Sequence, residues 1–210
     1  MVTKATEVKP TRSSRRREKS RTSLILAARE MMSVKGVDAT TIADITEAAD
    51  LGFGTFYNHF KSKDEIVDAA MADMVERLAD EIDQLIAPIE DPFFAQIVAW
   101  HQVVQLSVAE PIWGWFVLRS AKTLSMLNEG LMFRFHRDVK KSVEAGVFTV
   151  ADIAVVANLV GGGILSLVNA RLSGMINDDQ VLEGLALLVT HLGITLEQAR
   201  KLVRQPIPTL

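Results

Sequence analysis

The chain has no cysteine, which excludes disulfides, thiolate metal sites and cysteine nucleophiles. It also has few of the alternating β-branched stretches that are typical of strands. Its hydrophobic content of 49% is nevertheless high for a chain of 210 residues, which is long enough to bury a sizeable core. This combination predicts an all-α protein in which helices pack on helices.

Sequence signatures of catalysis are missing as well. The chain contains no H-E-x-x-H pair, no P-loop, no dinucleotide-binding glycine pattern and no nucleophile-elbow serine. The glycine run Gly161–Gly163 lies in an apolar stretch and is not followed by Lys-Ser/Thr, so it is not a phosphate loop. We therefore predict that the protein is not an enzyme and binds neither a metal nor a cofactor. The four histidines are scattered along the chain: His59, His101, His136 and His191.

Two apolar features bear on localisation. No apolar run follows the N-terminal charges before Leu24, which argues against a secretory signal. The run Val147–Val168 has the length of a membrane span, but Asp152, Asn158 and Gly161–Gly163 interrupt it and no basic flank orients it. This favours a buried core or dimer helix in a cytoplasmic protein.

Charge is divided unevenly along the chain. The first 21 residues carry eight Lys or Arg against two Glu, a local net charge of +6, whereas the whole chain carries −3. We expect residues 1–19 to form a flexible basic arm. Its Arg15, Arg16 and Arg17 can reach phosphates or a minor groove, and a solvated tail is the equal alternative.

The most informative stretch runs from Thr40 to Lys63. Thr41 can cap a helix together with Asp44, and Asp50-Leu51-Gly52 supplies the tolerant backbone of a tight turn. A second helix of residues 53–60 would follow this turn. Two helices joined in this way predict a helix-turn-helix, whose second helix enters the DNA major groove.

The second helix has an apolar and a polar side. Phe56 and Phe60 stand four residues apart and are expected to face the core. A capping box at Ser62–Glu65 opens the next helix, whose amides form a phosphate clamp with Lys61 and Lys63. The residues on the outer side are predicted to contact DNA: Gly54, Thr55, Tyr57, Asn58 and His59. The alternative is that they only pack within the protein.

This segment resembles the TetR/AcrR family of bacterial transcriptional regulators. The resemblance rests on Thr40–Ile45, on Ala48-Ala49 and above all on the run Gly54–Lys63. It implies that Thr41, Thr55, Tyr57, His59 and Lys63 contact DNA. Asp50 departs from the usual glycine, and Phe53, which could touch a thymine methyl or cover the core, departs from a polar residue. The full predicted DNA-binding set is Thr40, Thr41, Phe53, Gly54, Thr55, Tyr57, Asn58, His59, Lys61 and Lys63, with Arg15, Arg16 and Arg17 from the arm.

Helix-capping and helix-breaking residues along the chain predict three further regions. Residues 20–66 form the DNA-binding domain, 67–204 a helical effector-binding and dimerisation domain, and 205–210 a C-terminal tail. Helices are expected at about 20–35, 63–87, 150–174 and 178–192, and from residues 92, 111, 128 and 195. The pair 150–174 and 178–192 is the predicted dimer interface, with a stripe of Leu182, Leu185, Val189 and Leu192.

The body also collects aromatic and polar residues between positions 92 and 140. Apolar walls with a few polar anchors are typical of small-molecule sites, and the resemblance implies an effector pocket here. The alternative for each residue is ordinary core packing. The predicted effector-binding residues are Trp100, His101, Gln105, Trp113, Phe116, Arg119, Met132, Phe133, His136 and Asn158.

These observations predict a ligand-responsive DNA-binding regulator. We expect a homodimeric repressor that binds a palindromic, double-stranded operator and is released by a small, largely apolar effector. The alternative is a constitutive DNA-binding or protein-interaction module without an effector.

Overall fold

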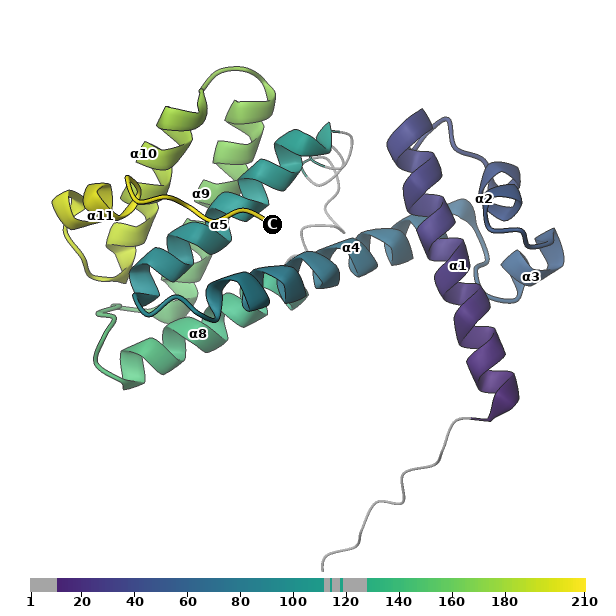
Figure 1. Ribbon diagram of the computed structural model, residues 1–210, viewed down its shortest axis with the longest axis horizontal. Coiled ribbons are helices and arrows are strands. Elements are labelled where there is room, and N and C mark those ends of the chain that lie inside the picture. Colours follow the sequence, from purple (N-terminus) through teal and green to yellow (C-terminus); the bar gives the residue numbers. More distant parts are fainter. Residues whose placement is uncertain (1–10, 112–113, 115–117, 119–127) are drawn as a thin grey trace, which may run out of the picture. The chain divides into compact units, whose positions relative to one another are not determined.

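The computed structural model describes residues 11–111, 114, 118 and 128–210. Helices make up the regular structure of these residues, and no strand occurs among them, which confirms the all-α prediction (Figure 1). The chain divides into two compact units, residues 1–70 and 71–210.

The first unit contains three helices and the start of a fourth. They are α1 (Arg12–Lys35), α2 (Ile42–Ala48), α3 (Phe53–Tyr57) and the opening turns of α4 (Lys63–Ile86). α1 packs against α2, and α2 packs against α3. The buried core of this unit comprises Leu24, Ile25, Ala28, Met32, Ile45, Phe56, Phe60, Ile66 and Val67.

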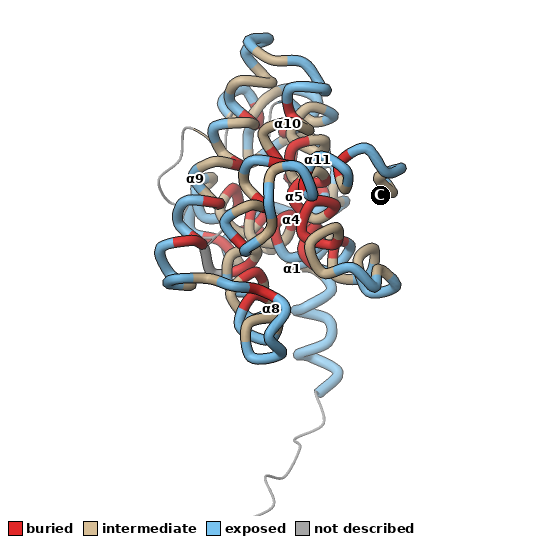
Figure 2. The backbone as a smooth tube through the Cα atoms, turned by 90° about the vertical axis from the view of Figure 1, so that its left-hand side faces the viewer, coloured by how far each residue is buried: buried red, intermediate tan, exposed pale blue. Residues whose placement is uncertain are grey.

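Helix α1 begins at Arg12, not near residue 20, so the part of the predicted flexible arm from Arg12 to Lys19 is helical. The side chain of Thr11 caps this helix by accepting a hydrogen bond from the Ser14 amide at 3.2 Å. Arginine, lysine and glutamate are good helix formers, so a cap suffices to extend the helix through this charged run. Its first two turns are exposed on all sides (Figure 2).

The helix-turn-helix has the predicted corner. Thr41 and Asp44 form a capping box at the start of α2. Asp50 adopts φ 52°, the left-handed conformation that the turn needs and that Asp tolerates. α3 ends at Tyr57, three residues earlier than expected, and the chain then turns toward α4.

The start of α4 departs from a full capping box. Ser62 accepts a hydrogen bond from the Glu65 amide at 3.2 Å. The Glu65 carboxylate accepts from the amide of Lys61 at 2.6 Å, one residue earlier than a capping box requires.

The second unit is built from the rest of α4 and the helices of the body. These are α5 (Pro92–Ala109), a π-helical turn (Asn128–Met132), α8 (Phe133–Glu144), α9 (Ile153–Leu172), α10 (Asp178–Val189), a short 3₁₀ turn (Thr190–Leu192) and α11 (Leu196–Leu202). Capping boxes at Asn177 and Thr195 open α10 and α11, where the sequence predicts helices to begin. The helix expected from Pro111 falls largely outside the described residues.

Helix α9 is the long apolar helix that the sequence predicts. It is long and apolar enough to cross a membrane by length and composition alone. One side of it packs into the core of the second unit, between α5, α8 and α10. α9 and α10 approach closely, because a Cβ added at Gly163 would overlap Leu188 and one at Gly184 would overlap Leu167.

The C-terminal tail is held by one buried side chain of α5. The Gln102 amide donates to the Pro208 carbonyl at 2.7 Å, and the Leu210 amide donates to the Gln102 oxygen at 3.3 Å. Ile207 packs against the core cluster. The tail is therefore part of the second unit.

Candidate nucleic-acid interface and effector cavity

The outward side of α3 carries the residues predicted to contact DNA. Phe53 and Tyr57 are 52% and 57% exposed, and Gly54 and Asn58 are exposed as well. Phe56 and Phe60 are buried and hold the helix against the unit's core. The Tyr57 hydroxyl makes no hydrogen bond to any part of the chain that the structure describes, so it remains available to an outside acceptor.

Gly54 has no internal reason to be glycine. A Cβ added there would meet no atom within 4 Å, and its φ does not lie in the left-handed region. The fold would accept a larger residue at this position. A close approach of α3 to another molecule is the physical use of such a position.

Thr40 is a correction to the predicted set. It is 1% exposed, and its hydroxyl donates to the Gly36 carbonyl at 2.8 Å. It therefore secures the connection between α1 and α2 and cannot reach DNA. Its burial depends on α1, which the local sequence around Thr40 does not reveal.

Thr41, Lys61 and Lys63 lie near the starts of α2 and α4. Thr41 is exposed, but its hydroxyl already donates to the Asp44 carboxylate and accepts from the Asp44 amide in the capping box. Lys63 donates to the Asp38 carbonyl at 2.8 Å, which leaves two of its three ammonium hydrogens for a phosphate. Lys61 is exposed.

The basic helix α1 lies beside the end of α3. The guanidinium of Arg21 stacks over the Phe60 ring at 5.2 Å, and Ser20 hydrogen-bonds His59 Nε2 at 2.8 Å. Only Nδ1 of His59 is left for an outside partner. The first turns of α1 carry five exposed basic residues, namely Arg12, Arg15, Arg16, Arg17 and Lys19. The three arginines predicted to contact DNA therefore lie on a helix and not on a flexible arm.

The surroundings of His59 favour its neutral form. Partial burial and then the positive charges of Arg17 and Arg21 hold the pKa of its imidazole below the usual value of 6.5. A neutral imidazole can donate from one nitrogen and accept at the other, which suits the contact with Ser20.

A cavity of about 490 Å³ lies within the second unit. This volume falls in the range of small-molecule sites. Its apolar wall includes Trp100, Met132, Phe135, Val160 and Ile164, and its polar wall includes Asp83, Arg134, His136, Asp138 and Asn158. The Trp100 and Phe135 rings meet edge-on at 5.8 Å.

Part of the predicted effector set lines this cavity. Trp100, Met132, His136 and Asn158 do so. Phe133 points to solvent, and His101 lies in a separate hollow beside α10 and α11, where it hydrogen-bonds Gln105 at 3.2 Å. Gln105 does not line the cavity either. The predictions for Phe133, His101 and Gln105 are therefore corrected, because helix phase and not composition decides which side faces the cavity. The predicted Trp113, Phe116 and Arg119 lie outside the described residues.

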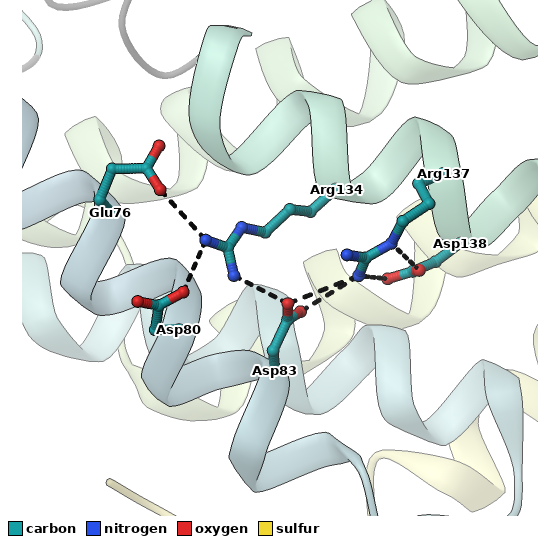
Figure 3. A network of polar contacts seen from close by, with 6 residues as sticks. All are labelled: Glu76, Asp80, Asp83, Arg134, Arg137 and Asp138. Carbon is teal, nitrogen blue, oxygen red and sulfur yellow. Dashed lines mark hydrogen bonds and ion pairs between the residues drawn. The ribbon is translucent and has the colours of Figure 1, made fainter. Parts of the chain in front are cut away.

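Sequence reasoning missed the charged edge of the cavity. Arg134 of α8 forms ion pairs with three acids of α4, at 3.1 Å to Glu76, 2.7 Å to Asp80 and 2.8 Å to Asp83 (Figure 3). Hydrogen bonding to Asp80, and then to Asp83 and Glu76, raises the pKa of Arg134 above its usual value. Glu76, Asp80 and Asp83 are spaced four and three residues apart, so the sequence places them on one side of α4. Such a row of acids usually forms a solvent-exposed helix face, which is why the sequence alone did not indicate a cavity edge.

A second arginine extends this network. The Arg137 guanidinium lies 3.4 Å from the Asp83 carboxylate of α4 and 2.7 Å from the carboxylate of Asp138, its neighbour on α8. Two arginines of α8 and three acids of α4 therefore join the two helices (Figure 3). Arg134, Asp83 and Asp138 are also cavity-lining residues. A molecule in the cavity therefore lies against the same groups that tie α4 to α8.

A helix-turn-helix head and a helical body with an internal cavity define a class of ligand-binding DNA-binding proteins. The family model for bacterial regulatory proteins of the tetR family matches residues 24–70, and that for the tetracyclin repressor-like C-terminal domain matches residues 91–205. The chain belongs to the TetR family of bacterial transcriptional regulators. Members of this family bind DNA and small-molecule effectors, commonly as dimers.

Solved structures and curated proteins agree with this assignment. The regulator RolR, solved in complex with resorcinol, is 30% identical over 92% of this chain and 97% of its own, with a TM-score of 0.79. The transcriptional repressor KstR2 of Mycobacterium tuberculosis is 26% identical and matches 55% of this chain and 74% of its own. FadR of Bacillus subtilis, solved with stearoyl-CoA, shares the fold at 17% identity and a TM-score of 0.65, covering 81% of this chain and 98% of its own.

The lowered pKa of His59 predicts a pH dependence of stability. The unfolded chain takes up this proton at a higher pH than the folded chain, so His59 reduces the free energy of unfolding as the pH falls below about 6.5. His101, whose pKa burial also lowers, acts in the same direction. We expect the melting temperature to fall between about pH 7.5 and about pH 5.5, and to fall less in His59→Gln. An equal fall in wild type and His59→Gln, measured by circular dichroism, would contradict this.

Proposed function

We propose that this protein is a homodimeric repressor that binds a palindromic operator and releases it when a small, largely apolar effector enters the body. The observation that carries the DNA-binding part is the outward side of α3. Exposed aromatic rings and a glycine without an internal role lie beside basic residues of α1 and α4. This arrangement suits a helix that enters the major groove while its neighbours bind phosphates.

Two parts of the head supply the phosphate contacts. Lys61 and Lys63 lie at the start of α4, and the exposed arginines of α1 form a charged helix beside the end of α3. Because Arg15, Arg16 and Arg17 are on a helix, they are held in place before DNA arrives and lose less conformational freedom on binding than a flexible arm. The arm therefore acts as a fixed extension of the interface.

The dimer forms through the outer sides of α9 and α10. Of the predicted stripe, Leu185, Val189 and Leu192 are fully buried within their own subunit, and Leu182 packs partly buried against the same core, so this stripe is not the interface. Val155, Leu159 and Leu187 are instead 57%, 53% and 49% exposed. Gly162 lies on the same exposed side of α9, and an added Cβ there would meet no atom, so a partner helix can approach closely.

The effector occupies the cavity of the second unit. RolR was solved with resorcinol, a small hydroxylated benzene, and this cavity combines aromatic walls with a charged edge. We infer that the effector is a small aromatic compound with hydroxyl groups, whose ring packs against Trp100 and Phe135. Its hydroxyls bond to Asp83, Asp138 or Arg134, which are strong partners for them.

The signal travels through α4, which contributes to both units. Ile82, Asp83 and Ile86 of α4 line the cavity, and the first turns of the same helix belong to the head. Two heads that bind successive major grooves must lie about 34 Å apart. An effector that binds better when α4 is displaced favours that displaced state, in which the spacing between the two heads is changed and DNA is released. The regulator acts in the cytoplasm, where its DNA is.

The direct test is selection of genomic fragments by the purified protein at about 0.15 M salt, where nonspecific phosphate binding is reduced. Recovery of one inverted repeat is the expected result. Recovery of no preferred sequence, with binding that disappears as salt rises, would remove operator recognition from the proposal. The constitutive alternative, a DNA-binding module without an effector, would give the repeat but no ligand response.

Gly54→Ala should move stability and DNA binding in opposite directions. The fold has room for the methyl group, and alanine favours a helix by about 0.5–1 kcal/mol over glycine, so the melting temperature rises. The methyl group keeps α3 from the base edges, so operator affinity falls by about tenfold or more. Unchanged affinity in a fluorescence anisotropy titration would show that α3 does not approach the bases closely.

Leu159→Asp should convert the dimer to a monomer, because it places a charge in the middle of an apolar interface. Sedimentation velocity measures this directly. Val34→Asp is the control, since Val34 is also an exposed apolar residue of a helix and lies on α1, away from the proposed interface. A Leu159→Asp protein that remains dimeric would place the interface elsewhere.

Resorcinol and related hydroxybenzenes should raise the melting temperature in a saturable way, since a ligand that binds the folded state stabilises it. Ala99→Phe narrows the cavity from α5 and should abolish the shift. Ala109→Phe is the control, because Ala109 is exposed on the same helix and does not line the cavity. Equal shifts in both variants would place the ligand outside this cavity.

A further inference from the structure

The recognition helix α3 begins with an exposed phenyl ring. Phe53 is its first residue and is 52% exposed, whereas Phe56 and Phe60 on the same segment are fully buried. The core of the head is thus filled without Phe53. Of the two sequence-based interpretations, cover for the core and contact with DNA, the structure favours the second.

The composition of α3 limits what it can read. Between Phe53 and Tyr57 it has no charged residue and no amide side chain, the groups that pair with guanine or adenine. Asn58, just after the helix, is the first such residue. The first turn of α3 therefore offers the major groove an apolar surface.

One apolar group marks the major groove. Thymine carries a 5-methyl group there, and apolar side chains that contact it distinguish thymine from the other bases. Phe53 and Tyr57 are four residues apart on α3 and are therefore neighbours on one side of it, with the bare backbone of Gly54 beside them. Gly54 lets the helix approach the bases, and this approach brings the Phe53 ring within reach of a methyl group.

We propose that Phe53 reads a thymine in each half-site of the operator by packing against its 5-methyl group. This inference rests on the proposed DNA-binding function. DNA is the occupant of this apolar surface because the surface is bordered by cations, Lys61 after α3 and Arg17 and Arg21 of α1 near His59. A partner protein would instead need an acidic surface around an apolar centre.

The test uses deoxyuridine, which lacks the 5-methyl group of thymine and pairs identically with adenine. Each thymine of the selected operator is replaced in turn by deoxyuridine in both half-sites, and affinity is measured by fluorescence anisotropy with wild type and Phe53→Ala. Loss of one buried methyl is expected to cost about fourfold per half-site, so about fifteenfold for the symmetric pair. The same replacement should cost Phe53→Ala less than about twofold.

A second experiment restores the methyl group on a different base. Placing 5-methylcytosine opposite guanine at the sensitive position returns the methyl group without thymine, and it should bind wild type more tightly than cytosine does. Val34→Ala is the matched control, because it removes exposed apolar surface from α1, and it should keep the wild-type response to every replacement.

The outcomes separate this inference from the proposed function. If the protein selects an operator but no deoxyuridine replacement changes affinity by more than about twofold, Phe53 does not read a methyl group. If a replacement costs wild type and Phe53→Ala equally, another residue reads that methyl group, and the assignment to Phe53 is overturned. If no operator is selected at all, the proposed function itself fails.

Discussion

Burial of Phe56 and Phe60 is the constraint on which the DNA-binding surface depends. α3 has only five residues, and so short a helix is not stable in water by itself. The inward rings of Phe56 on α3 and of Phe60 just after it, with Arg21 stacked over Phe60, fix its position against the core of the head. Once these rings are buried, the phase of the helix turns Phe53, Gly54 and Tyr57 outward. The proposed reading surface is therefore a consequence of packing on the opposite side.

The body depends on a different interaction, the ion pairs between α4 and α8. Arg134 is half-buried and meets three acids, of which Glu76 and Asp80 are exposed to solvent. Because the charges remain partly solvated, each ion pair is expected to stabilise the protein only modestly, and the set acts mainly as a network. The same residues border the cavity, so ligand binding and the attachment of α4 share one set of charges. In the proposed function, an effector that touches only the body acts through these charges on α4, which continues into the head.

Glycines serve two different purposes in this chain. Gly54 on α3 and Gly162 on α9 have open space where a side chain would be, unlike Gly163 and Gly184, which α9 and α10 need in order to pack. The second pair permits close approach within the subunit, and the first pair lies on the surfaces proposed for DNA and for a partner subunit. Both arise from the same property of glycine, the absence of a Cβ, and only the coordinates distinguish them.

The sequence by itself determined the helical class, the helix-turn-helix and most helix boundaries of the body, because capping boxes, turn residues and apolar spacing act locally. The corner at Asp50 has the predicted backbone. The helices predicted near residues 92, 150, 178 and 195 begin after the caps Asp91, Asp152, Asn177 and Thr195. Only the tertiary structure decided which residues face which neighbour. Thr40 is buried because α1 covers it, and Leu185 faces its own core and not a partner subunit. Arg134 meets acids more than fifty residues away. Such facts depend on the phase and packing of helices distant in sequence, which no local pattern encodes.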